Sequence, residues 1–293
     1  MKPLKGILDR FYNEFDFRER LLEDPIAFPR RYRDPRDVEV SAFISSCFAY
    51  GRVELFKPVL EKLHSLMGKH PSAFLRDLDV EKQRQHFTFK YRFNETLDIL
   101  CLLFLMKTLL RRHGSLENAF MRYHAPEEPD TGSGIAGLAA EILSIDTTPV
   151  YGRNLRPSGM TFFFPSPVTG SACKRMNLFL RWMVRDRDID FGLWGKIPKD
   201  KLVIPLDTHI ARIARCIGLT RRASADWKTA LEITASLKEF DPADPLKYDF
   251  ALCHHGISGA CRARPGRLGP GGLKEADFCR ECVFRASPGA AAN

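Results

Sequence analysis

The chain has 293 residues, of which 44% are hydrophobic and 28% charged, and its formal net charge is +9. This composition predicts a soluble globular protein with a core large enough to fold without disulfides. The longest apolar run, Leu97 to Leu110, contains Asp98 and Lys107 and is too short to cross a membrane. The N-terminus carries no apolar signal core, so we expect a cytoplasmic protein whose eight cysteines are thiols or metal ligands.

The pattern of hydrophobic residues predicts an all-α fold. Strand-like alternation is almost absent, apart from the aromatic run 160–164. Turn-rich segments at 124–137, 151–159 and 262–272 predict loops. Helical spacing of apolar residues recurs in nine segments: 4–23, 38–67, 94–112, 116–123, 134–144, 173–187, 207–217, 226–238 and 243–256.

We therefore expect one helical domain over residues 1–256, with two lobes joined near 124–137, and a cysteine-containing tail over 257–293. Gly114 and Gly218 each follow a predicted helix directly, which is the position where glycine ends helices most often.

Positive charge is concentrated between Gly170 and Arg222, where 12 Lys and Arg residues face five Asp and no Glu. Such a balance suits a polyanion, because contacts to phosphates release counterions and give affinity that does not depend on sequence. A solvated basic face without a partner would have the same composition.

A lysine opens the predicted helix 173–187. Its apolar positions, Met176, Phe179 and Met183 among them, fall on one face and predict burial there. Lys174, Arg181 and Arg185 fall on the opposite face, which predicts an exposed cationic surface. Neighbouring positive charges would lower the pKa of Lys174 and increase the fraction of reactive amine. A plain surface lysine is the alternative interpretation.

Asp207 precedes another amphipathic helix, whose buried stripe is predicted to contain Ile210, Ile213, Ala214 and Ile217. Asp207 or Thr208 is therefore the expected N-cap. A carboxylate at that position accepts backbone N–H groups and stays ionised at neutral pH. Such a group can simply cap the helix, or it can stabilise a cationic sugar and assist proton transfer from lysine.

Together these segments resemble the helix–hairpin–helix superfamily of DNA glycosylases, and the resemblance extends over about residues 38–262. The hairpin positions are filled by Val168, Gly170, Ala172 and Lys174, and the catalytic strip by Leu206-Asp-Thr-His-Ile-Ala-Arg212. The resemblance implies that Lys174 is the Schiff-base nucleophile of a bifunctional glycosylase and lyase, and that Asp207 is its activating carboxylate.

The resemblance also implies contacts to double-stranded DNA that contains a damaged base. The turn at Gly170 and Ser171 is expected to bind a phosphate. The side chains expected to contact DNA are Arg175, Arg181, Arg185, His209 and Arg212. Trp182 and Trp194 could stack on an extruded base, although packing in the core is the simpler interpretation.

The chain departs from the superfamily pattern in three places. The spacing from Lys174 to Asp207 is 33 residues, which is longer than usual but similar to that of the archaeal GO-glycosylases that act on 8-oxoguanine. The hairpin has Ala172 where a second glycine is usual. Tyr50-Gly-Arg52 stands where many members carry a glutamine that fills the space left by the extruded base.

Four cysteines near the C-terminus predict a metal site. Cys279 and Cys282 have the two-residue spacing that metals favour, and Cys253 and Cys261 could complete the set. Relatives that resemble endonuclease III end in a four-cysteine loop for an iron–sulfur cluster. An iron–sulfur cluster, zinc or no metal all remain open, and His254 or His255 could replace Cys253 as a ligand. Cys47, Cys101, Cys173 and Cys216 are predicted to be buried small apolar residues.

The function expected from the sequence is base-excision repair in the bacterial cytoplasm, at the nucleoid. An oxidised purine such as 8-oxoguanine is the expected substrate, by analogy of fold alone. Two alternatives remain open: a catalytically inactive nucleic-acid-binding protein on the same scaffold, and a metal-stabilised protein whose basic groove binds RNA or a protein.

Overall fold

The computed structural model describes residues 2–261 and 283–284. The described part of the chain is helical and contains no β-strand, only two isolated β-bridges, so the predicted all-α class is confirmed. Short 3₁₀ turns punctuate the chain at 25–27, 29–31, 167–169 (η3) and 199–201. No helix among the described residues has the length and apolar character that a bilayer crossing requires.

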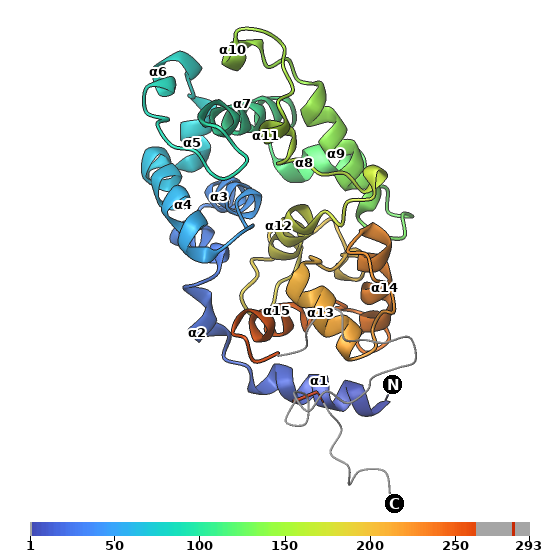
Figure 1. Cartoon of the computed structure of the whole chain (residues 1–293). Coiled ribbons are helices and arrows are strands. Elements are labelled where there is room, and N and C mark those ends of the chain that lie inside the picture. The colour runs from blue at the N-terminus through green and yellow to red at the C-terminus, as the bar shows by residue number, and fades with distance from the viewer. Residues whose placement is uncertain (1, 262–282, 285–293) are drawn as a thin grey trace, which may run out of the picture.

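The described residues form two hydrophobic clusters. The helices that build them lie mainly in the upper and the lower part of Figure 1, respectively. The first cluster is built mainly by the helices from α3 to α12. Their bounds are α3 (Pro35–Cys47), α4 (Val53–Met67), α5 (Pro71–Arg76), α6 (Val80–Arg84), α7 (Thr96–His113), α8 (Leu116–Met121), α9 (Gly132–Ser144), α10 (Thr148–Tyr151), α11 (Ser158–Thr161) and α12 (Lys174–Val184).

The second cluster lies below the first in Figure 1. It takes Leu8 from the N-terminal helix, the extended segment 203–206 and the last three helices. Phe284 returns from the C-terminal region and packs its ring on Phe11 and His255. The helices are α1 (Lys2–Glu14), α13 (Thr208–Cys216), α14 (Trp227–Lys238) and α15 (Asp249–Ile257), and the short α2 (Phe17–Leu21) follows α1.

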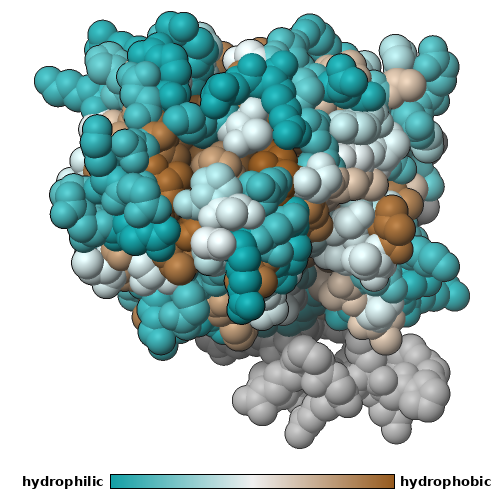
Figure 2. Space-filling view, turned by 90° about the horizontal axis from the view of Figure 1, so that it is seen from above, coloured by the Kyte–Doolittle hydropathy of each residue, from teal (hydrophilic) through white to brown (hydrophobic). Residues whose placement is uncertain are grey.

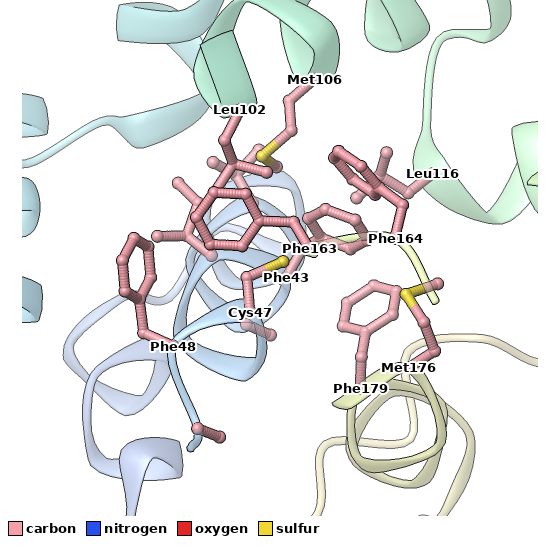
Figure 3. Packing of buried hydrophobic residues seen from close by; sticks show 14 of the residues in the cluster. Phe43, Cys47, Phe48, Leu102, Met106, Leu116, Phe163, Phe164, Met176 and Phe179 are labelled. Carbon is pink, nitrogen blue, oxygen red and sulfur yellow. The ribbon is translucent and has the colours of Figure 1, made fainter. Parts of the chain in front are cut away.

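Helix α12 runs through the middle of the molecule, and every residue from Arg175 to Val184 is buried. Figure 3 shows its Met176 and Phe179 beside Phe43 of α3 and the ring of Phe164. The predicted apolar face of this helix is therefore confirmed. Ion pairs from the other face reach α15, so α12 joins the two clusters.

The segment 124–137 does not separate the two clusters. It leads from α8 into α9, whose first residue is Gly132, and both helices bury side chains in the first cluster. After α1, which contributes Leu8 to the second cluster, the chain returns to that cluster only after residue 202. The acidic and Gly-rich composition of this segment indicated a turn but carried no information about which helices flank it.

The predicted helix 38–67 is interrupted at residues 48–52, and this interruption shapes the site described below. Gly51 has a φ of +80°, and a Cβ there would lie 2.8 Å from the Tyr91 hydroxyl and 2.7 Å from a guanidinium nitrogen of Arg92. Only glycine fits this close approach at a left-handed backbone position.

Figure 2 views the molecule from the top of Figure 1, where hydrophilic side chains dominate and hydrophobic ones show between them.

Candidate active site

The turn before α12 fixes the position of Lys174. Gly170 adopts the left-handed conformation that ends η3, and its carbonyl accepts the backbone N–H of Trp227 at 3.1 Å. Ser171 forms an isolated antiparallel bridge with Asp226, which caps α14. The turn is thus held against the second cluster, and the chain then enters α12 at Lys174. The local geometry places this lysine at the boundary between the two clusters.

Asp207 caps α13, as the sequence predicted. Its Oδ1 accepts the backbone N–H groups of His209 at 2.9 Å and Ile210 at 2.8 Å. Two backbone donors on one oxygen fix the carboxylate and satisfy part of the helix N-terminus. The second oxygen, Oδ2, is left to face Lys174.

Lys174 and Asp207 meet across the two clusters. The Lys174 Nζ lies 3.5 Å from Asp207 Oδ2 and donates a hydrogen bond to the Ala49 carbonyl at 3.2 Å. The lysine side chain is 32% exposed and that of the aspartate 13%, so solvent reaches the amine. Burial of the carboxyl raises the pKa of Asp207, but the Lys174 charge and the Ile210 N–H outweigh it, and the net pKa shift is downward.

Both residues line one cavity of about 370 Å³. Its wall is formed by residues of α4, α12, α13 and α15 together with segments 23–25 and 49–52. Five carboxylates and three Lys or Arg side chains belong to the lining, namely Glu23, Asp24, Glu54, Asp207 and Asp249 against Arg52, Lys174 and Arg181. The cavity is therefore suited to a neutral or cationic group, because negative charge predominates on its wall.

Cys253 lies next to the same carboxylate. Its thiol donates to Asp207 Oδ2 at 3.5 Å, from the middle of α15. Burial, followed by the negative charge of Asp207, raises the pKa of this thiol well above its usual value. A metal ligand must be a thiolate, and a thiolate here would repel Asp207. Cys253 thus belongs to the cavity lining as a thiol, and its predicted role as a metal ligand stays a prediction.

The other predicted metal ligands are not assembled by the described residues. Cys261 is half-buried, and Cys279 and Cys282 lie outside the part of the chain that the structure describes. Among the alternatives, His254 pairs with Asp24 at 3.1 Å, and His255 packs its ring on Phe11 and Phe284. No cluster of three or more metal-binding side chains occurs within residues 2–261 and 283–284.

The predicted cationic face of α12 is wrong. Arg181 and Arg185 are each only 2% exposed, and both pair with Asp190. Arg181 also pairs with Asp249, and Arg185 pairs with Asp188 at 3.2 Å and Asp244 at 2.9 Å. These arginines are buried because their faces meet carboxylates from the loop after α12 and from the region of α15. They cannot contact a DNA phosphate in this conformation.

Arg175 is also buried, and its predicted role in DNA binding is corrected as well. Its guanidinium donates to the Phe162 carbonyl and lies 4.1 Å from the centre of the Phe162 ring. The same group lies 5.1 Å from the centre of the Tyr50 ring. Desolvation lowers the pKa of this arginine, as expected for a cation that packs among aromatic rings.

Four of the predicted DNA contacts remain reachable. Gly170 is exposed, Ser171 and Arg212 are half-buried, and His209 lines the cavity. Arg212 donates to the Gly256 carbonyl at 3.1 Å. A Cβ at residue 256 would approach the His209 Cβ to 2.7 Å, so glycine allows α15 to pack against the start of α13.

An aromatic cluster beside the cavity was not predicted from the sequence. Phe93 is 59% exposed and Phe162 36% exposed, and both rings contact Tyr50. Tyr50 lies between Ala49 and Gly51, which belong to the cavity lining. The run of aromatic residues at 160–164 was the available signal, but the partners Tyr50 and Phe93 are distant in sequence.

The predictions for the remaining cysteines and tryptophans are mostly confirmed. Cys47, Cys101 and Cys173 are buried, whereas Cys216 is half-buried. Trp182 and Trp194 both belong to the first cluster, so neither stacks on a base. The Trp194 indole donates to Glu39 Oε1 at 2.9 Å.

Comparison with known proteins gives one match. The model of a family described as "Protein of unknown function (DUF2400)" matches residues 24–258, which include every element of the cavity wall but Glu23. No curated protein matches this chain. No solved structure matches it either.

Proposed function

The chain belongs to the DUF2400 family, and from its cavity we propose that it is a DNA glycosylase with AP-lyase activity. The observation that carries the proposal is the approach of Lys174 Nζ to Asp207 Oδ2, at 3.5 Å, on the wall of a solvent-reachable cavity. An amine nucleophile beside a fixed carboxylate is the pair that breaks an N-glycosidic bond through a Schiff base.

The geometry supports a separate chemical role for each of the two residues, Lys174 and Asp207. Asp207 Oδ2 accepts a proton from the Lys174 ammonium, and the free amine attacks C1′ of the deoxyribose. The electrons of the glycosidic bond leave with the base, which takes up that proton from Asp207, so the carboxylate is ionised again. The attached amine gives a proton to the ring oxygen as the sugar ring opens, which leaves a Schiff base between Lys174 and C1′. Asp207 then accepts a C2′ proton, and elimination releases the 3′ phosphate. The ionised Asp207 also stabilises positive charge on the sugar.

The proposed fold is the two-lobed helix–hairpin–helix arrangement, with double-stranded DNA as partner. Gly170 and Ser171 would bind a phosphate at the turn before α12, and His209 and Arg212 would contact DNA near α13. The exposure of this turn and the half-buried state of Arg212 support these roles. The proposed substrate is an oxidised base such as 8-oxoguanine, removed in the bacterial cytoplasm.

Borohydride trapping tests the chemistry directly. The wild-type protein should form a covalent adduct with a duplex that carries 8-oxoguanine or an abasic site. Lys174→Ala should lose the adduct completely, because no other lysine of the described part of the chain lines the cavity. Lys196→Ala is the matched control, since Lys196 is 54% exposed, pairs with Glu117 and lies outside the cavity lining.

Asp207→Asn separates chemistry from binding. We expect turnover to fall about 10²–10⁴-fold, the range for loss of a general acid or base, whereas affinity for the duplex is preserved. Binding without any adduct in the wild type would instead indicate the inactive nucleic-acid-binding protein. Absence of binding to DNA would favour a partner of RNA or protein.

The proposal for a metal is limited to the C-terminal cysteines. Cys261, Cys279 and Cys282 would supply ligands to an iron–sulfur cluster or to zinc, in a structural role. Absorbance near 400 nm, roughly where thiolate-ligated clusters absorb, and metal analysis of anaerobically purified protein test this. A colourless protein without bound metal would refute both metals.

A further inference from the structure

The floor of the cavity carries two buried polar groups whose hydrogen bonds are incomplete. Arg181 and Asp249 both line the cavity, and the side chain of each is only 2% exposed. Arg181 Nη1 donates to Asp249 Oδ2, and Arg181 Nε donates to Asp190 Oδ1 at 3.3 Å. Arg181 Nη2 and Asp249 Oδ1 have no hydrogen-bond partner among residues 2–261 and 283–284. One donor and one acceptor therefore remain unsatisfied on neighbouring side chains.

Such a pair is costly when nothing binds it. A buried polar atom without a partner destabilises the fold, and more so when the group is charged. The same arginine is rigid, because two carboxylates fix its orientation and Arg185 in turn holds Asp190. The unsatisfied donor and acceptor are thus held in place before any ligand arrives, which favours recognition of a ligand edge.

The distance from the lysine fits a nucleoside. Arg181 follows Lys174 by seven residues on the same helix, so both lie on one face and are about 10 Å apart along the axis. A deoxyribose at Lys174 would direct its attached base along α12 toward Arg181. Phe250 and His254 of α15 also line the cavity, and the centre of the Phe250 ring lies 5.7 Å from the Arg181 guanidinium carbon.

We infer that Arg181 and Asp249 recognise the hydrogen-bonding edge of the extruded base, an inference that rests on the proposed glycosylase function. Arg181 Nη2 donates to an exocyclic oxygen, and Asp249 Oδ1 accepts the adjacent ring N–H. The O6 and N1–H groups of an oxidised guanine present this acceptor and donor side by side. The substrate class is therefore a base with an intact lactam edge, with 8-oxoguanine as its representative.

Two duplexes separate recognition of the base from the chemistry of the lysine. One carries 8-oxoguanine opposite cytosine, and the other carries a preformed abasic site, which keeps the reactive sugar carbon but has no base. Asp249→Asn preserves side-chain size and a hydrogen bond to Arg181. We expect release of 8-oxoguanine to fall about tenfold to hundredfold, the effect of losing one charge-assisted hydrogen bond. Trapping on the abasic site should be unchanged.

Asp244→Asn is the matched control. Asp244 belongs to the same buried network through Arg185, but it is absent from the cavity lining. This variant should keep the wild-type ratio of base release to abasic-site trapping even if its stability decreases. A change in the ratio in both variants would indicate a general effect of the network and would overturn the inference.

The remaining outcomes are distinct. If Asp249→Asn releases 8-oxoguanine as fast as the wild type, the base edge is not recognised there. If it loses both reactions equally, Asp249 only supports the fold and the inference is wrong. If the wild type traps the abasic site but releases no base, the lysine chemistry stands and base recognition fails. If the wild type traps neither duplex, the proposed function itself fails.

Discussion

At the scale of single residues, Asp207 tells most about the site, because its two carboxylate oxygens contact different groups. Oδ1 is occupied by the backbone of α13, and Oδ2 faces both Lys174 and the Cys253 thiol. The N-cap role could be predicted from the sequence, since an amphipathic helix follows directly. The thiol could not, because Cys253 lies 46 residues further along the chain.

Cys253 should therefore influence catalysis and leave metal content unaffected. Cys253→Ala removes the hydrogen bond to Oδ2, so the rate of trapping on an abasic site should fall about threefold to tenfold, as for one neutral hydrogen bond. Cys253→Ser keeps a donor and should restore most of the rate. Equal metal content in both variants and the wild type would agree with this role, and loss of metal in Cys253→Ala would contradict it.

His64 gives a second prediction at this scale, on stability against pH. Its Nδ1–H donates to the Leu60 carbonyl at 2.8 Å, and its Nε2 accepts the Ser41 hydroxyl at 2.7 Å. Desolvation lowers the pKa of His64 from 6.5 to about 4. Between these two pH values the unfolded chain binds a proton at His64 and the folded chain does not. The free energy of unfolding therefore falls as the pH drops from about 6.5 to 4.

The His64 contribution can be isolated by substitution. His64→Gln keeps hydrogen-bonding groups but cannot titrate. Between neutral pH and pH 4, the unfolding free energy of the variant should therefore decrease by about 3 kcal/mol less than that of the wild type. This difference follows from about 1.36 kcal/mol per pKa unit. Urea denaturation at several pH values measures this. Parallel pH curves for the two proteins would show that His64 is not the titrating group.

At the scale of elements, α12 shows where sequence patterns stop being informative. The helix was predicted over 173–187 and runs over Lys174–Val184, so periodicity predicted its apolar face and, to within one residue, its start. The burial of Arg181 and Arg185 was not, because their partners Asp244 and Asp249 come from a distant segment. A cationic stripe on a helix has the same spacing whether it faces solvent or carboxylates, so periodicity alone could not distinguish the two.

The buried ion pairs of α12 should matter for stability when one member is removed. Asp190 bonds both Arg181 and Arg185, and its side chain is fully buried. Asp190→Ala leaves two buried cations short of a partner and should cost about 3–5 kcal/mol in unfolding free energy. Asp200→Ala removes an exposed pair with Lys238 and should cost about 0–1 kcal/mol. Similar losses in the two variants would contradict this interpretation.

The interruption between α3 and α4 shows another limit of the sequence. Apolar residues continue at helical spacing through this region, so one helix was predicted over 38–67. α3 ends at Cys47, and within the interruption Gly51 has a positive φ and the Tyr91 hydroxyl donates to the Tyr50 carbonyl. The break brings the Ala49 carbonyl to Lys174, and it exposes the ring of Tyr50 to Phe93 and Phe162. A long-range contact thus decided an element boundary.

At the scale of the whole molecule, the all-α class followed from periodicity, whereas the arrangement of the two clusters did not. The predicted boundary at 124–137 was placed by loop composition, yet Phe120 and Leu138 on either side of it share one cluster. The positions of Lys174 at a helix start and of Asp207 at a cap were predicted because both are local features, and the structure brings the two side chains together. The remainder of the cavity is assembled from segments that only the fold brings together.

The two members of the reacting pair belong to different halves of the protein. Lys174 stands on the helix that fills the upper cluster, and Asp207 caps a helix of the lower one (Figure 1). A shift of one half against the other by the width of a single atom would uncouple amine from carboxylate. Under the proposed function, the relative position of the two halves would therefore govern whether Asp207 can assist Lys174.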